Sequence, residues 1–142
     1  MNSIDILAQA KDAILHQDVT LAEELYRSIL SVQPHQIDAL NGMGAIFFEL
    51  GKPEQSLEYY RHAHAEAEKI FGGTYPARLS WIEKHKPALR ALHGIGLNEY
   101  RLGNRARAEK IFQNILAMNP TDEQGIHFLL ADIAKGKKLW KE

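Results

Sequence analysis

Histidine is the residue type in this chain best suited to metal or proton chemistry, because seven occur in 142 residues. A helical metal site of the H-E-x-x-H kind places two histidines four residues apart, so that both face one ion. His62 and His64 are two residues apart, which puts them about 200° from each other around a helix axis. No two histidines are four apart, and spacing alone leaves open whether His85, His93 and His127 meet. We therefore predict surface or groove histidines and no metal site.

Nucleophiles and phosphate-binding loops are also poorly represented. Cysteine is absent and none of the five serines lies in a G-x-S-x-G turn. There is no G-x-x-x-x-G-K-[ST] loop, and the glycines of GMGAIF and GIGLNE fall inside expected helices with no strand before them. Carboxylate pairs such as Glu66 and Glu68 lie on expected polar faces. The sequence therefore predicts no enzyme, no catalytic residue and no cofactor.

The elements that carry these residues repeat along the chain. Three segments share a small residue, an aromatic residue four positions later, and a small or aliphatic residue three positions after that. The triplets are Ala22/Tyr26/Ile29, Ser56/Tyr60/Ala63 and Ala108/Phe112/Ile115. They are 34 and then 52 residues apart, which is one period followed by one period with 18 extra residues. The preceding segments keep the same steps, as in Ala10/Gly44/Gly96, so the repeat is real.

Apolar residues within each repeat recur at helical spacing in two runs separated by a short turn. Gly51 and Gly103 are expected to end helices. Gly44 and Gly96, inside helices, mark places where two helices approach too closely for a Cβ atom. We predict helix pairs at 3–16/19–32, 37–50/53–70 and 88–102/105–118, followed by a final helix at 121–135.

This pattern resembles the tetratricopeptide repeat (TPR), a family of helix-pair solenoids. The resemblance implies an all-α, right-handed α-α superhelix of three repeats in a single domain spanning residues 1–142. Its parts would be repeats at about 3–36, 37–70 and 89–122, an insertion at 71–88, a capping helix at 121–135 and a basic tail at 136–142. The tail is expected to be frayed, unless Trp140 docks back onto the last helix pair.

The 18 extra residues of the insertion include Tyr75, Trp81 and Ile82, which are costly to leave in water. We expect a short helix that starts at Pro76 and runs through Trp81 and Ile82. Two interpretations remain open: the insertion is a spacer whose aromatic side chains pack on the repeats, or it lines or gates a binding groove.

In such solenoids the first helix of each pair lines a concave surface. The repeat register places a mixed polar and apolar set of side chains there, with Leu7, Lys11, Ile14 and Asp38 at its N-terminal end. The predicted peptide-binding groove consists of Asn41, Ala45, Phe48, Glu49, Arg90, His93, Leu97, Tyr100, Arg101 and His127.

The resemblance implies protein binding, so the leading hypothesis is a non-enzymatic adaptor that holds a peptide or helix of a partner in this groove. One TPR subclass grips a partner's C-terminal carboxylate with a set of lysine, asparagine and arginine side chains. Leu7, Gly42, Gly94 and Leu97 are nonpolar where that set has polar residues, which disfavours docking of that kind. Small three-repeat chaperones of bacterial secretion systems are similar in length and repeat number only.

Charge is unevenly distributed along the chain. Residues 1–70 carry 5 basic and 11 acidic side chains, whereas residues 71–142 carry 12 and 7. The basic half, near Arg90 and Arg101, is expected to prefer an acidic partner segment. The split, with Phe128 and Trp140, also supports the alternative of head-to-tail self-assembly into a homo-oligomer. Basic and aromatic residues interleave between 76 and 110, but a net charge of −1 argues against nucleic-acid binding. The N-terminus lacks a secretory signal pattern and no apolar stretch is long enough for a bilayer, so we expect a cytoplasmic protein without a membrane partner.

Overall fold

The fold is all-α in the computed structural model, which describes residues 2–141. The helices are α1 (Ser3–Leu15), α2 (Val19–Val32), α3 (Ile37–Glu49), α4 (Pro53–Ile70), α5 (Lys86–Arg101), α6 (Arg105–Met118) and α7 (Ile126–Ala134). The first six match the predicted helix pairs to within about two residues, and the fold class is confirmed.

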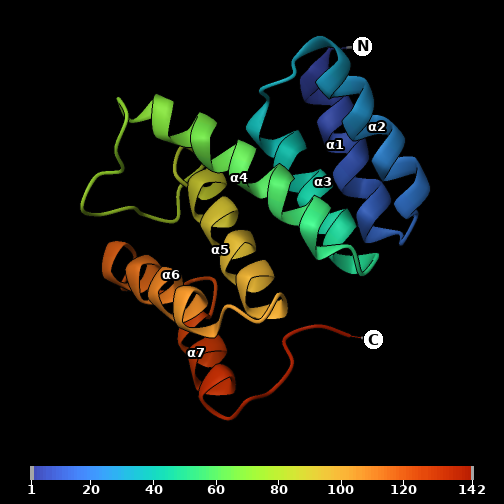
Figure 1. The fold of residues 1–142 in the computed structure, drawn as a ribbon. Coiled ribbons are helices and arrows are strands. Elements are labelled where there is room, and N and C mark those ends of the chain that lie inside the picture. The colour runs from blue at the N-terminus through green and yellow to red at the C-terminus, as the bar shows by residue number, and fades with distance from the viewer. Residues whose placement is uncertain (1, 142) are drawn as a thin grey trace.

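Consecutive helices pack against one another along the whole chain, and α3 also packs directly against α5. The result is a helical-repeat solenoid that runs from α1 and α2 at one end to α6 and α7 at the other (Figure 1). Its core forms around the repeated positions, with Ala22, Tyr26 and Ile29 buried in the first pair and Ala108, Phe112 and Ile115 in the third. None of the helices formed by residues 2–141 has the length and apolarity needed to cross a membrane.

The ring of Tyr60 on α4 is held between two glycines of neighbouring inner helices. A Cβ atom at Gly44 on α3 would lie 2.8 Å from this ring, and one at Gly94 on α5 would lie 2.4 Å from it. Tyr26 against Gly42 and Phe112 against Gly96 are equivalent contacts, at 2.3 and 2.6 Å. The predicted close approach at Gly44 and Gly96 is therefore correct, and glycine at 42 and 94 has the same cause.

A buried polar network joins the second and third helix pairs. The Ser56 hydroxyl donates to the Gly44 carbonyl at 2.6 Å, and Asn98 Nδ2 donates to the same hydroxyl at 2.8 Å. The buried Glu99 carboxylate receives Arg61 from α4 at 2.9 Å and Arg107 from α6 at 3.1 Å. Because paired buried charges require their partners, these contacts fix α5 relative to its two outer neighbours.

The final helix was predicted too long. It begins at Ile126 rather than at 121, because Asp122 and Gly125 have positive φ angles of 50° and 69° that helical residues do not adopt. The Asp122 carboxylate accepts hydrogen bonds from the free backbone N–H groups of Ile126, at 2.6 Å, and His127, at 3.0 Å. It therefore supplies the polar partners that the start of a helix needs.

The predicted short helix between Pro76 and Ile82 is wrong, because residues 71–85 are an irregular series of turns and α5 begins at Lys86. Buried Leu79 anchors this segment through its backbone N–H, which donates to the Met118 carbonyl at 2.9 Å. Tyr75 packs edge-on against Phe71 and hydrogen-bonds His64 at 2.8 Å. The aromatic side chains of the segment thus pack on the helices, and Trp81 lies beneath the Arg90 guanidinium at 5.4 Å.

Candidate partner-binding groove

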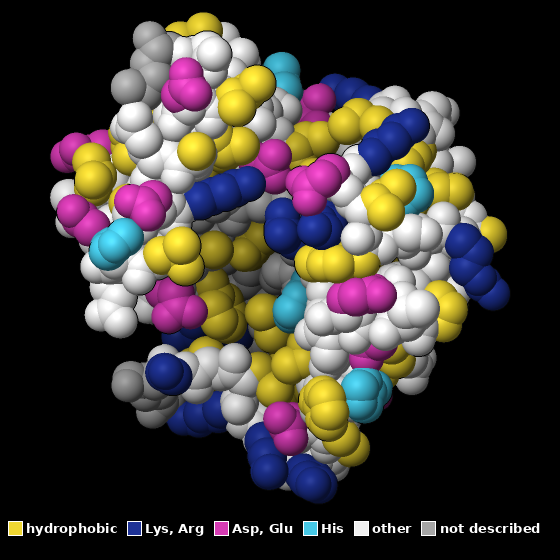
Figure 2. Space-filling model, turned by 180° about the vertical axis from the view of Figure 1, so that it is seen from behind, with side chains coloured by type: hydrophobic (Ala, Val, Ile, Leu, Met, Phe, Trp, Pro, Cys, Tyr) yellow, Lys and Arg dark blue, Asp and Glu magenta, His cyan; other side chains and the backbone are white. Residues whose placement is uncertain are grey.

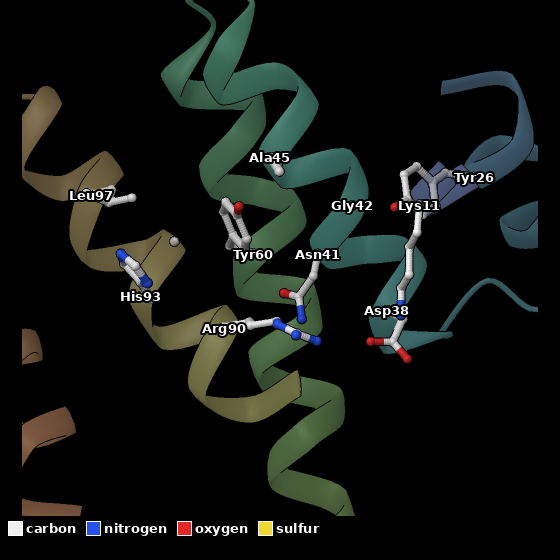
Figure 3. Close-up of a pocket in the computed structure, with 11 residues that line it drawn as sticks. Lys11, Tyr26, Asp38, Asn41, Gly42, Ala45, Tyr60, Arg90, His93 and Leu97 are labelled. Carbon is white, nitrogen blue, oxygen red and sulfur yellow. The ribbon is translucent and has the colours of Figure 1, made fainter. Parts of the chain in front are cut away.

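A cavity of about 400 Å³ lies between the inner helices α3 and α5. Its side chains come from five helices, with α1 and α2 at one side and α4 at its floor (Figure 3). The lining residues are Lys11, Tyr26, Asp38, Asn41, Gly42, Ala45, Tyr60, Arg90, His93, Gly94 and Leu97. Of the predicted groove residues, this cavity brings together Asn41, Ala45, Arg90, His93 and Leu97.

A second cavity of about 600 Å³ adjoins the first between α1 and α3. Both are lined by Lys11, Tyr26, Gly42 and Ala45, so they form one continuous depression, which we call the concave groove. The second cavity is more apolar and adds Ile14, Leu15, Val19 and Ile46, with Glu49 at its edge. Figure 2 shows the hollow on this face, with hydrophobic side chains inside it and charged ones around the rim.

The floor of the groove is made by the rings of Tyr26 and Tyr60, which belong to outer helices. Burial raises the pKa of both phenols, that of Tyr60 strongly, so both stay neutral. We predicted a groove lined by the first helix of each pair and by His127 of the final helix, and therefore missed these two residues. Gly42 and Gly94 in the sequence could have predicted these rings, because a side chain at either position would keep the ring out of the groove.

Asn41 lines the groove and carries a buried hydrogen-bond acceptor that is not used. Its side chain is only 7% exposed, and its Nδ2 donates to the Pro87 carbonyl at 3.0 Å. Because a carbonyl accepts only from a donor, this bond fixes the orientation of the amide. The Oδ1 atom is then buried without a hydrogen-bond partner, a state that costs free energy, and a donor in the groove reaches it only after the side chain turns.

Two cations and one carboxylate border the first cavity: Lys11 from α1, Arg90 from α5 and Asp38 from α3. Both cations also act on the exposed Glu83 carboxylate, whose pKa is lowered mainly by its hydrogen bond to Lys86 and further by the charges of Arg90 and Lys11. The Arg90 guanidinium rests on Trp81, which orients it by a cation–π contact. The two cations therefore make this end of the groove positive, and Asp38 and Glu83 offset part of that charge.

His93 lies in the wall of the groove as a neutral imidazole. Burial lowers its pKa to about 4, against a smaller opposite effect of the Asp122 charge. Its Nδ1 lies 3.3 Å from Gln124 Nε2, and its ring packs edge-on against Phe112. The residue contributes a polar but uncharged surface at neutral pH.

Two predicted groove residues, Tyr100 and Arg101, are engaged by the chain's own C-terminal segment. The Tyr100 hydroxyl donates to the Lys137 carbonyl at 2.7 Å. Arg101 donates to the Phe48 carbonyl at 2.9 Å, and its guanidinium lies between the rings of Phe48 and Trp140. The tail is therefore packed over the end of α5 rather than frayed.

His127 lies on α7, where its Nδ1 contacts the Asp122 carboxylate. It lines neither cavity of the concave groove. The three histidines whose convergence the sequence left open form no metal-ligand group within residues 2–141.

The helix pairs, the aromatic rings packed against glycines and the concave groove define a helical-repeat fold. Residues 37–77 match the family model of the tetratricopeptide repeat. The chain is also similar to the Protein CTR9 homolog of Arabidopsis thaliana, with 26% identity over 109 residues. This alignment covers 77% of the chain but only 8% of that protein. Residues 37–77 of the chain are therefore a tetratricopeptide repeat by this match.

Proposed function

We propose that the chain is a non-enzymatic adaptor whose concave groove binds an extended acidic segment of a partner protein. The family match supports an interaction scaffold, since TPR repeats stack into curved surfaces that hold other proteins. The unpartnered Asn41 Oδ1 carries the proposal further. Because Asn41 lines the groove, a turn of its side chain would bring this acceptor within reach of the commonest donor on a peptide, a backbone N–H.

The acceptor favours an extended segment over a helix. Inside a helix the backbone N–H groups are already bonded to carbonyls four residues earlier. An extended chain offers a free N–H at each residue apart from proline. Such a segment can donate to Asn41 while its side chains alternate between the wall and the opening of the groove.

The positive charges around the first cavity favour a partner segment that has acidic side chains beside Asn41. Lys11 and Arg90 flank the first cavity, and the carboxylates that act on them are Asp38 in the lining and the exposed Glu83. The adjoining apolar pocket formed by Ile14, Leu15, Val19 and Ile46 accepts a hydrophobic side chain. The expected sequence thus combines one or more acidic residues with a neighbouring large apolar residue.

Selection from a displayed random-peptide library on the immobilised full chain tests this proposal. Selected peptides should combine acidic and apolar residues. Arg90→Glu and Asn41→Ala should each weaken their binding about tenfold or more, because each removes a group that faces the peptide. Lys110→Glu, a charge reversal on the exposed surface of α6, is the control and should leave affinity within about twofold.

Two outcomes would contradict the proposal. One is a set of selected peptides without acidic residues. The other is a set whose binding survives Arg90→Glu and Asn41→Ala but is lost with Lys110→Glu, which would move the site to the outer helices.

Self-assembly is a second candidate, supported by a large apolar side chain on α7. Phe128 is 66% exposed at this end of the solenoid, and burying so large a ring against a second copy would remove apolar surface from water. Trp140, in contrast, packs on Tyr100 and Arg101 of its own chain and does not support this candidate. Light scattering of the wild type and Phe128→Asp over a concentration series tests it; a monomer at all concentrations would exclude it.

A further inference from the structure

Three metal-ligating side chains meet on the outer surface, away from the concave groove. His35 comes from the turn between α2 and α3, whereas His62 and Glu66 lie one helical turn apart on α4. Within residues 2–141, these three side chains are the group whose ligand atoms lie close enough together to hold one metal ion. The sequence search overlooked them because it looked for two histidines four apart rather than a histidine and a carboxylate.

The separations of the ligand atoms fit a small divalent ion. His35 Nδ1 lies 2.9 Å from His62 Nε2 and 3.3 Å from Glu66 Oε1, and the last two atoms are 3.9 Å apart. A point equidistant from three atoms with these separations lies about 2.0 Å from each, the length of Zn–N and Zn–O bonds in proteins. The three side chains therefore need little movement to share one ion.

We propose that His35, His62 and Glu66 form a binding site for Zn²⁺ or a similar transition-metal ion. Two imidazoles and one carboxylate are a ligand set typical of zinc sites with a fourth position open to water. Mg²⁺ and Ca²⁺ are excluded as preferred occupants, because they favour all-oxygen coordination. In the complex, each imidazole would carry its proton on the ring nitrogen that faces away from the ion.

The ion would join two repeats. His35 belongs to the turn that ends the first helix pair, and the other two ligands belong to the outer helix of the second pair. The burial gradient suits this role, since Glu66 is 14% exposed, His62 39% and His35 64%. The ion would join the exposed His35 in the turn to a more buried carboxylate on a helix.

Lys69 competes with a metal ion for the same carboxylate oxygen. Its ammonium lies 2.9 Å from Glu66 Oε1, and with the hydrogen bond from Lys69 as the largest cause the pKa of Glu66 is lowered. Because Lys69 is exposed, its long side chain can turn away when the ion binds. Removing it should therefore tighten binding, which is the opposite of what removing a ligand should do.

Isothermal titration of the metal-free full chain with ZnCl₂ tests the site. We expect one saturable site in the wild type, at least about tenfold weaker binding in His35→Gln, His62→Gln and Glu66→Gln, and tighter binding in Lys69→Ala. The control is His16→Gln, because His16 and Asp12 are also a histidine–carboxylate pair one turn apart but lack a third ligand. This variant should bind as the wild type does.

Thermal unfolding with and without ZnCl₂ provides a second measurement on the same variants. Because an ion that binds only the folded chain raises its unfolding temperature, the wild type and His16→Gln should be stabilised and the three ligand variants should not. Circular dichroism without metal shows whether each variant folds. The proposal is overturned if the wild type shows no saturable binding, or if folded ligand variants bind Zn²⁺ as tightly as His16→Gln.

Discussion

The turns that end the first helices of the three repeats need the same left-handed backbone conformation, but only two of them have glycine. Gly51 and Gly103 have φ angles of 73° and 91°, and Gln17, at the equivalent position in the first repeat, has 60°. A side chain with a Cβ atom adopts this conformation at a cost of about 1–2 kcal/mol. The first repeat therefore carries local strain that the other two avoid.

Gln17→Gly is expected to raise the free energy of unfolding by about 1 kcal/mol, because glycine adopts the left-handed region without steric cost. The measurement is the midpoint of urea-induced unfolding. Gly103→Ala is the matched reverse change, since a Cβ atom added to Gly103 would meet no other atom within 4 Å, and it should lower the midpoint through backbone strain alone. A lower midpoint in Gln17→Gly would show that the turn is not strained.

His93 is expected to make stability depend on pH. Its pKa of about 4 in the folded chain is below the value near 6.5 of an exposed histidine, so the unfolded chain binds a proton first as pH falls. The free energy of unfolding therefore keeps the full contribution of neutral His93 above about pH 6.5. It loses that contribution as pH falls towards 4, by a total on the order of 3 kcal/mol.

Urea unfolding of the wild type and His93→Gln at pH 7 and pH 4.5 measures this contribution. The variant should lose less stability over this interval than the wild type does. Burial also lowers the pKa of His64, but His64 is present in both proteins and cancels in the comparison. Equal losses in the two proteins would contradict the assignment to His93.

At the scale of the elements, the spacing of the inner helices is set by a ring on an outer helix. Tyr60 occupies the space left by Gly44 on α3 and Gly94 on α5, so one side chain from α4 separates the two helices that line the groove. The same ring forms part of the groove floor. The packing of α3 against α5 and the shape of the concave groove therefore depend on the same residues.

Gly94→Ala is expected to lower the free energy of unfolding by about 1–3 kcal/mol, because the new methyl group would overlap the Tyr60 ring. This loss should occur although alanine is favoured over glycine in a helix by about 1 kcal/mol. A double-mutant cycle with Tyr60→Leu, measured by urea unfolding, isolates the clash. The smaller side chain should recover part of the loss, and strictly additive effects would show that the ring is not what Gly94 accommodates.

The sequence predicted the six repeat helices well because glycine, proline and apolar periodicity are local signals that agree with one another. It failed at residues 71–85, where Leu79 and Tyr75 pack through contacts with distant helices. It also failed at the start of α7, where the cap formed by Asp122 depends on a turn that propensity does not reveal. Both failures lie outside the repeat.

The candidate site was predicted in part for a related reason. Asn41, Ala45, Arg90, His93 and Leu97 follow from the repeat register, and the structure places them around one cavity. Tyr100 and Arg101 occupy equally suitable register positions, but the tail covers them through Lys137 and Trp140. The position of a residue in the repeat predicts the direction in which its side chain points, but it does not predict which other segment of the chain packs on that side chain.

At the scale of the whole molecule, the concave groove crosses the boundary between the acidic and the basic half of the sequence. Lys11 comes from the acidic half and Arg90 from the basic half, yet both face the first cavity. Arg101, expected to act with Arg90, instead binds the Phe48 carbonyl. The attraction for an acidic segment is thus expected to rest on Lys11 and Arg90.

The central claim, that partners bind in the concave groove, is tested most directly by NMR titration of the full chain with an acidic peptide selected on it. The backbone amide shifts should change most on the inner faces of α1, α3 and α5 around Asn41, and these changes should be lost in Arg90→Glu. Shift changes confined to α2, α6 or α7, unaffected by Arg90→Glu, would contradict the claim.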